Sequence, residues 1–165
     1  MIVAATDRLV LRDLLERDAE NIFLLNSDLE VLRYVHDVPF ADTAAARKWI
    51  ADIGKQLPQG IGRWAIEAND GTWIGRCSLR RYADGEVLMG YRLLREQWGK
   101  GYATEAVRAM LNLAFNLHGL MSVDSKVARD NLASQRVMEK NCGRFCKEDS
   151  AENFVEVLVY RFDRR

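Results

Sequence analysis

Two glycines one residue apart, Gly99 and Gly101, follow a strand-like run and come directly before a long amphipathic segment. Glycine lets the backbone turn sharply, and because it lacks a side chain it lets an anion approach the peptide N–H groups. The first N–H groups of the helix that follows have no intrahelical partner and lie at the positive end of its dipole. The stretch from Glu96 to Ala106 is therefore predicted to bind a phosphate group.

Two nucleotide-binding motifs match this loop only in part. A mononucleotide P-loop needs Lys followed by Ser or Thr after its second glycine, whereas here Tyr102 follows Gly101. The dinucleotide fingerprint fits better, since Thr104 takes the third glycine position and Asp124 lies about twenty residues further on. A dinucleotide-binding module therefore stays open, although that fold opens with this unit and here most of the chain precedes it.

The composition is that of an ordinary globular chain. Its 165 residues are 48% hydrophobic and 29% charged, which fits a single domain over residues 1–165 with a real core. The 24 basic and 24 acidic residues balance, so net charge does not favour nucleic acid as a partner. No apolar run has membrane-spanning length and no signal-peptide pattern opens the chain, which predicts a cytoplasmic protein without a membrane partner.

The cysteines give no sign of a metal site. Cys77, Cys142 and Cys146 form no CxxC pair, and only His36 and His118 accompany them. This inventory argues against a structural zinc site. We expect no metal, and reduced, partly buried thiols.

The residues before the loop predict three strands joined by tight turns. The strand-like runs cover residues 63–68, 72–81 and 86–94, and Asn69-Asp70-Gly71 and Asp84-Gly85 lie between them. Such turns join consecutive antiparallel strands. Only beyond the glycine loop does a helix lead across to another strand. This order makes the dinucleotide-binding module a distant alternative, because strands alternate with helices from the start of that fold.

The remaining segments predict helices and outer strands. Apolar spacing and capping residues predict helices over residues 18–26, 28–35, 42 or 43 to Pro58, 102–118 and about 129–141. Residues 8–12 alternate charged and aliphatic side chains as a half-exposed strand does. Further strands are predicted over residues 121–127 and 155–162.

The string WGKGYATEA, residues 98–106, follows the Met89-Gly90-Tyr91 strand and precedes a helix. It resembles the acetyl-CoA loop of the GNAT superfamily of N-acetyltransferases, most of all the branch that acetylates the N-termini of ribosomal proteins. The likeness covers nearly the whole chain, with the 71–75 hairpin and Asn131-x-x-Ser134 in the expected order. The expected fold is an α/β (α+β) domain with a mixed, mostly antiparallel twisted sheet of about seven strands, flanked by helices on both faces.

The resemblance implies a site for acetyl-CoA where two neighbouring parallel strands separate. Strand backbone would pair with the pantetheine arm, loop N–H groups would hold the pyrophosphate, and Asn131 would bond the arm. Lys100 and Arg95 lie either beside the CoA phosphates or in solvent. The cofactor-binding residues so implied are Tyr91, Arg92, Leu93, Gly99, Lys100, Gly101, Tyr102, Ala103, Thr104 and Asn131.

The chemistry implied is direct acetyl transfer from a thioester to a neutral primary amine in a ternary complex. The family often has a tyrosine acid, but that position is Met138 here, whereas the ribosomal branch places a serine at Ser134. Ser134 is therefore the candidate catalytic acid, and a plain helix-start serine is the equal alternative. The usual glutamate before the Gly-Tyr pair is Leu88, so the base is unassigned. Glu67 or Glu86 would either hold a water in its place or be merely solvated.

Other functions and acceptors stay open. The missing tyrosine and Leu88 also fit an acyl-CoA-binding sensor without catalysis. A protein N-terminus, a polyamine, an amino acid and an aminoglycoside all fit as the amine acceptor. The α-amino group, with a pKa of about 8, needs less help from a base than a lysine at about 10.4. The sequence is compatible with a homodimer as well as a monomer.

Overall fold

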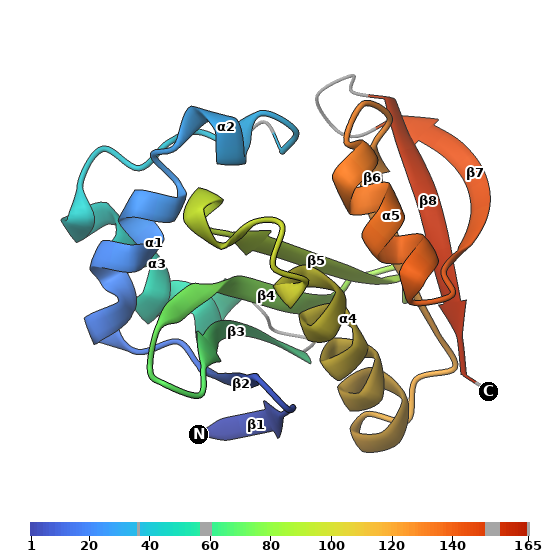
Figure 1. Ribbon diagram of the computed structural model, residues 1–165, viewed down its shortest axis with the longest axis horizontal. Helices are drawn as coiled ribbons and strands as arrows, with labels where there is room; N and C mark the ends of the chain where they lie inside the picture. Colours follow the sequence, from blue (N-terminus) through green and yellow to red (C-terminus); the bar gives the residue numbers. More distant parts are fainter. Residues whose placement is uncertain (36, 57–60, 151–155, 165) are drawn as a thin grey trace.

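Figure 1 shows the computed structural model of the chain, a twisted sheet with helices on both faces. The structure describes residues 1–35, 37–56, 61–150 and 156–164. In these residues the sheet has eight strands, in the order β1-β2-β3-β4-β5-β6-β8-β7. The strands are β1 (Ile2–Ala5), β2 (Leu9–Asp13), β3 (Ile61–Ala68), β4 (Trp73–Arg81), β5 (Val87–Leu93), β6 (Ser122–Ala128), β7 (Arg144–Ser150) and β8 (Glu156–Asp163).

The mixed, mostly antiparallel sheet is confirmed, and the two outermost strands are the ones that the sequence did not reveal. β1 has no alternation of polar and apolar residues. β7 is almost entirely exposed along its length and consists mainly of charged and polar residues. Edge strands of this kind lack the half-buried pattern that makes a strand visible in a sequence.

The helices lie close to where they were predicted. They are α1 (Ala19–Leu25), α2 (Leu29–Leu32), α3 (Thr43–Gln56), α4 (Tyr102–Asn112), which continues as a π-helical turn over Leu113–Leu117, and α5 (Leu132–Lys140). Asp42 accepts a hydrogen bond from the Ala45 N–H at 2.8 Å and so caps α3. The end predicted for this helix at Pro58 lies outside the described residues. Short 3₁₀ turns cover Glu16–Asp18 and Arg95–Gln97.

The three central strands form the predicted antiparallel meander. Gly71 and Gly85, in the turns that join them, have φ of +88° and +89°. Glycine adopts this left-handed conformation without the penalty that other residues incur. The two turn glycines therefore set the register that aligns β3, β4 and β5.

β5 and β6 are parallel neighbours that separate almost at once. A single register pair, Leu88 with Asp124, joins them in the described residues. β5 runs on to Leu93 paired with β4, and β6 runs on to Ala128 paired with β8. The edge of β5 beyond Leu88 therefore faces no strand on the β6 side within the part of the chain that the structure describes.

Two apolar clusters hold helices against opposite faces of the sheet (Figure 1). The larger includes Val107 and Met110 of α4, together with Ile66 of β3. The smaller includes Ile22 of α1, together with Ala65 of β3. Adjacent residues of a strand point to opposite faces, so Ala65 and Ile66 show that α1 and α4 cover different sides.

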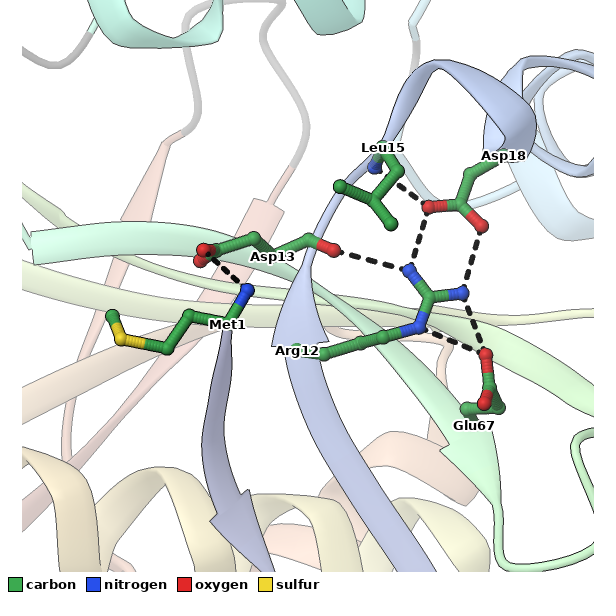
Figure 2. Close-up of polar contacts among 6 residues, drawn as sticks. All are labelled: Met1, Arg12, Asp13, Leu15, Asp18 and Glu67. Carbon is green, nitrogen blue, oxygen red and sulfur yellow. Dashed lines mark hydrogen bonds and ion pairs between the residues drawn. The ribbon is translucent and has the colours of Figure 1, made fainter.

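A buried ion cluster ties the start of α1 to the sheet (Figure 2). Arg12 of β2 donates two hydrogen bonds to Asp18, at 2.8 and 2.9 Å, and two to Glu67 of β3, at 2.8 and 2.6 Å. Asp18 also accepts from the Leu15 N–H at 2.8 Å. The bond to Asp18 raises the pKa of Arg12, although burial opposes the shift. Removing one partner of such a buried cluster leaves an uncompensated charge, so its role is to hold the fold together.

Candidate active site

The two loop glycines have the backbone conformation that their residue type predicted. Gly99 and Gly101 have φ of +75° and +82°. A Cβ at Gly99 would meet nothing within 4 Å, and one at Gly101 would meet Arg8 at 3.4 Å. The backbone angle, and not crowding by the protein, therefore requires glycine at both positions, and space stays open beside the loop.

The first turn of α4 presents free N–H groups next to these glycines. The Glu105 N–H donates to the Gly101 carbonyl at 3.2 Å, which is the first bond of the helix. The N–H groups of Tyr102, Ala103 and Thr104 precede this bond and have no helical acceptor. Glycine angles, N–H groups and helix dipole together form the geometry of an anion site.

Arg8, in the turn between β1 and β2, fastens this loop to the sheet. It donates to the Lys100 carbonyl at 3.0 Å and to the Glu105 carboxylate at 2.7 Å, and its guanidinium lies 4.9 Å from the centre of the Tyr102 ring. Thr6 donates to the same carboxylate at 2.6 Å. Burial would raise the pKa of Glu105, but the bonds from Thr6 and Arg8 lower it overall. This role of Arg8 could not be predicted from the sequence, because its partners lie 92 and 97 positions away.

Lys100 and Arg95, the basic residues in and next to the glycine loop, have protein partners. Lys100 donates to Gln97 at 3.0 Å, and Arg95 forms an ion pair with Asp28 at 3.0 Å. Trp98 donates its indole N–H to the Leu93 carbonyl at 3.0 Å, which joins the loop to the end of β5. These contacts stiffen the loop.

Across the separation of β5 and β6, two hydroxyl groups meet. The oxygens of Tyr91 on β5 and Ser134 on α5 are 3.0 Å apart. Asn131 caps α5 by accepting from the Ser134 N–H at 3.1 Å, which orients this first turn. Burial raises the pKa of Tyr91 while the Ser134 bond opposes the shift, so the phenol keeps its proton at neutral pH. The structure thus brings Tyr91, Asn131 and Ser134 together.

The contact of the Tyr91 hydroxyl with Ser134 could not be predicted from the sequence, in which only the backbone of Tyr91 was expected to take part in the site. The position of the family's usual tyrosine acid, Met138, is fully buried in the larger apolar cluster. Its side chain fills the core beneath α5. The hydroxyl in contact with Ser134 therefore comes from β5, and the family's usual tyrosine position on α5 supplies none.

Both carboxylates considered for the base have partners. Glu67 is held by Arg12 in the buried ion cluster (Figure 2). Glu86 lies before β5, at the end of the strand away from the glycine loop, and forms a long ion pair of 3.8 Å with Lys126. Neither contact favours a role as base.

In the described residues, no group of three or more His, Cys, Asp and Glu side chains is arranged to hold a metal ion. No helix in that part of the chain is long and apolar enough to span a membrane.

The comparisons with known proteins agree with this geometry. Residues 8–143 match the family model described as an acetyltransferase (GNAT) domain. The chain is 32% identical over 166 residues to the uncharacterized N-acetyltransferase p20 of Bacillus licheniformis, covering 95% of this chain and 92% of that protein.

Two solved structures share the fold over nearly the whole chain. The ribosomal L7/L12 alpha-N-protein acetyltransferase RimL, in complex with coenzyme A, superposes with a TM-score of 0.86 at 16% identity and covers 99% of this chain and 98% of its own. The spermidine N-acetyltransferase of Vibrio cholerae, in complex with CoA and spermine, gives 0.83 at 18% identity and 96% of each chain.

Proposed function

Since this chain belongs to the GNAT family of acetyltransferases, we propose that it moves an acetyl group from acetyl-CoA to a primary amine. The observation that carries the proposal is the separation of β5 from β6 after one register pair. The glycine loop lies at the end of β5, and the hydroxyls of Tyr91 and Ser134 lie across the separation. One opening thus borders an anion site and a pair of proton donors.

The free edge of β5 suits the amide-rich pantetheine arm, which can pair with an exposed strand as an added strand does. The Leu93 carbonyl already accepts from Trp98, so we assign this pairing to backbone groups up to Arg92. The N–H groups from Gly99 to Thr104 are assigned to the pyrophosphate. The side-chain oxygen of Asn131 accepts the hydrogen bond that caps α5. We therefore assign the side-chain NH₂ group of Asn131 to the pantetheine arm.

The reaction needs a neutral amine, stabilisation of the carbonyl oxygen and a proton for the departing thiolate. The amine nitrogen forms the new C–N bond, the C–S bond breaks, and the proton that the amine loses balances the one that the thiol gains. We assign to Ser134 the hydrogen bond donated to the sulfur, a role supported by the Tyr91 hydroxyl, whose oxygen lies 3.0 Å from that of Ser134. Tyr91 is thus a positioning residue behind Ser134.

An acyl-CoA-binding sensor is the second candidate function. It is favoured by one observation, that Met138 is fully buried and Leu88 nearly so, where the family often has its acid and base. The site would then bind acetyl-CoA without turning it over.

A panel of amines separates these two functions. The protein is incubated with acetyl-CoA and, in turn, an N-terminal peptide, a polyamine, an amino acid and an aminoglycoside, while free CoA thiol is measured. Amine-dependent release of CoA, with a matching acetylated product by mass spectrometry, is expected. Tight binding of acetyl-CoA without release for any amine would favour the sensor.

A further inference from the structure

Arginines gather on the face of the sheet away from α4. Arg76 of β4 is the register partner of Arg92 of β5, and partners in an antiparallel pair point to the same face. Arg80 lies four residues along β4 on that face, and Arg63 of β3 is the partner of Ser78 between them. We call Arg63, Arg76, Arg80 and Arg92 the arginine face.

Two members of the arginine face contact one aromatic ring. The guanidiniums of Arg63 and Arg76 lie 5.1 and 5.2 Å from the centre of the same Trp49 ring, on α3. Arg92 pairs with Asp37 and donates to Asn26 at 2.8 Å. In the described residues Arg76 makes no hydrogen bond or ion pair, and its Nε is buried without a partner. A buried N–H donor of this kind is costly unless a ligand or another group accepts from it.

The electrostatics agree with this geometry. Burial, and after it the charge of Arg92, lower the pKa of Arg76 to about 9, although the charge of Asp37 opposes the shift. Burial and then the charge of Arg80 lower the pKa of Arg63. The four cations therefore repel one another in a half-buried setting. A bound anion would relieve both the repulsion and the loss of solvation.

The arginine face surrounds a floor of small residues beside the proposed reaction site. Ser78 and Gly90 are register partners, with the Arg76–Arg92 pair on one side along the strands and Arg80 on the other. A Cβ built on Gly90 would meet only the Ser78 hydroxyl, at 3.8 Å, so the floor is open there. Gly90 also lies on the edge of β5 that faces no strand. A molecule on this floor is thus next to the opening between β5 and β6.

We propose that the arginine face binds an anionic group of the acceptor, so that the acceptor is an amine that also carries a carboxylate or a phosphate. This inference rests on the proposed acetyl transfer and narrows its substrate class. Planar guanidiniums bind such groups through paired N–H donors. Polyamines and aminoglycosides are disfavoured, because their positive charges would meet the four arginines.

Matched amines test the proposal on the full-length protein. L-Leucine is compared with 3-methylbutylamine, which lacks only the carboxylate, and O-phosphoethanolamine with ethanolamine. Spermidine and a short peptide that starts with acidic residues complete the set. We expect kcat/KM to be at least about tenfold higher for the anionic member of one pair, since hydrogen bonds between charged groups contribute on this scale. A preference within the leucine pair would identify the anionic group as a carboxylate, and a preference within the ethanolamine pair would identify it as a phosphate.

Two variants connect the preference to the arginine face. Arg76→Gln should raise KM for the anionic amine about tenfold to a hundredfold, with kcat changed little, and Arg76→Lys should recover part of the loss. Arg81→Gln is the control. Arg81 is exposed, and because it follows Arg80 directly in the strand its side chain points to the opposite face of the sheet. If Arg76→Gln has the same Tm as the wild type, both alone and with acetyl-CoA, its fold and its cofactor site are intact.

The outcomes separate the acceptor class from the function. Transfer to spermidine or to the uncharged amine of each pair, at equal or better kcat/KM, overturns the arginine-face proposal and leaves acetyl transfer standing. If no amine releases CoA, acetyl transfer fails, and the arginine face is judged by thermal shift with N-acetyl-L-leucine against N-acetyl-3-methylbutylamine in the presence of CoA. A shift for the acid alone, lost in Arg76→Gln, supports the anion site. Equal shifts or none overturn it.

Discussion

The cofactor side and the acceptor side of this site are built from different parts of the chain. On the proposed cofactor side the groups assigned to the ligand are peptide N–H groups over residues 99–104, next to two glycines with positive φ. On the proposed acceptor side they are the side chains of the arginine face, which come from three strands, and two of them, Arg63 and Arg76, lie over the Trp49 ring of α3. A backbone site allows little variation and fits one cofactor, whereas a site made of side chains can change with the substrate.

The largest effect is expected at Ser134, where the two sides meet. If its hydroxyl helps the thiolate to leave, that interaction grows only as the thioester breaks. Ser134→Ala should therefore lower kcat by about 10²–10⁴-fold, while the Kd for acetyl-CoA changes little. Tyr91→Phe should lower kcat less, because Tyr91 acts through Ser134. Steady-state kinetics and calorimetric titration measure the two quantities, and full turnover in Ser134→Ala would make Ser134 a helix-start residue only.

The next largest effect tests the backbone character of the cofactor side. Gly101→Val places a β-branched side chain at φ +82° and beside the proposed pyrophosphate position. Binding of acetyl-CoA should weaken by about tenfold to a hundredfold, given a strain of about 1–3 kcal/mol. Gly85→Val is the matched control, since Gly85 also has a positive φ, of +89°, its Cβ would meet no atom within 4 Å, and it lies in the β4–β5 turn. Equal affinities in the two variants would mean that the glycine loop is structural only.

A smaller effect is expected at Arg8, which supports the loop without lying in the motif. Arg8→Ala removes the bond to the Lys100 carbonyl and the ion pair with Glu105 in the first turn of α4. The Kd for acetyl-CoA should rise about tenfold, which is the scale of one hydrogen bond to a charged group. Arg47→Ala, which removes an exposed ion pair with Glu16, should leave the Kd unchanged. An unchanged Kd in Arg8→Ala would show that the loop holds its shape alone.

The contrast between a site made of local backbone and a site made of distant side chains also explains which features could be predicted from the sequence. Gly99 and Gly101 imply their own backbone angles, and the turns at Gly71 and Gly85 imply the antiparallel meander, because these signals are local. Arg8 and Glu105 lie far apart in sequence, and so do Trp49 and Arg76. Only the fold brings such pairs together. The Tyr91 hydroxyl was missed for the same reason, since its partner Ser134 comes from α5.

The smallest effect concerns stability at alkaline pH. Below about pH 10 Tyr91 is neutral in both the folded and the unfolded chain. Above that pH the unfolded tyrosine ionises, whereas burial keeps the pKa of the folded one raised, so the folded state loses stability as the pH rises. The Tm of the wild type should therefore fall more steeply above about pH 10 than that of Tyr91→Phe. Parallel curves would show that Tyr91 is not buried beside Ser134 in solution.

Thermal unfolding with acetyl-CoA, compared with NAD, tests the assignment of the glycine loop most directly. A ligand bound only by the native state stabilises it by mass action, by about 2.7 kcal/mol at about a hundred times its Kd. For a chain of this length that raises Tm by about 5–10 °C. We predict this shift for acetyl-CoA, a much smaller one for NAD, and a reduced acetyl-CoA shift in Gly101→Val. A shift with NAD and none with acetyl-CoA would contradict the account.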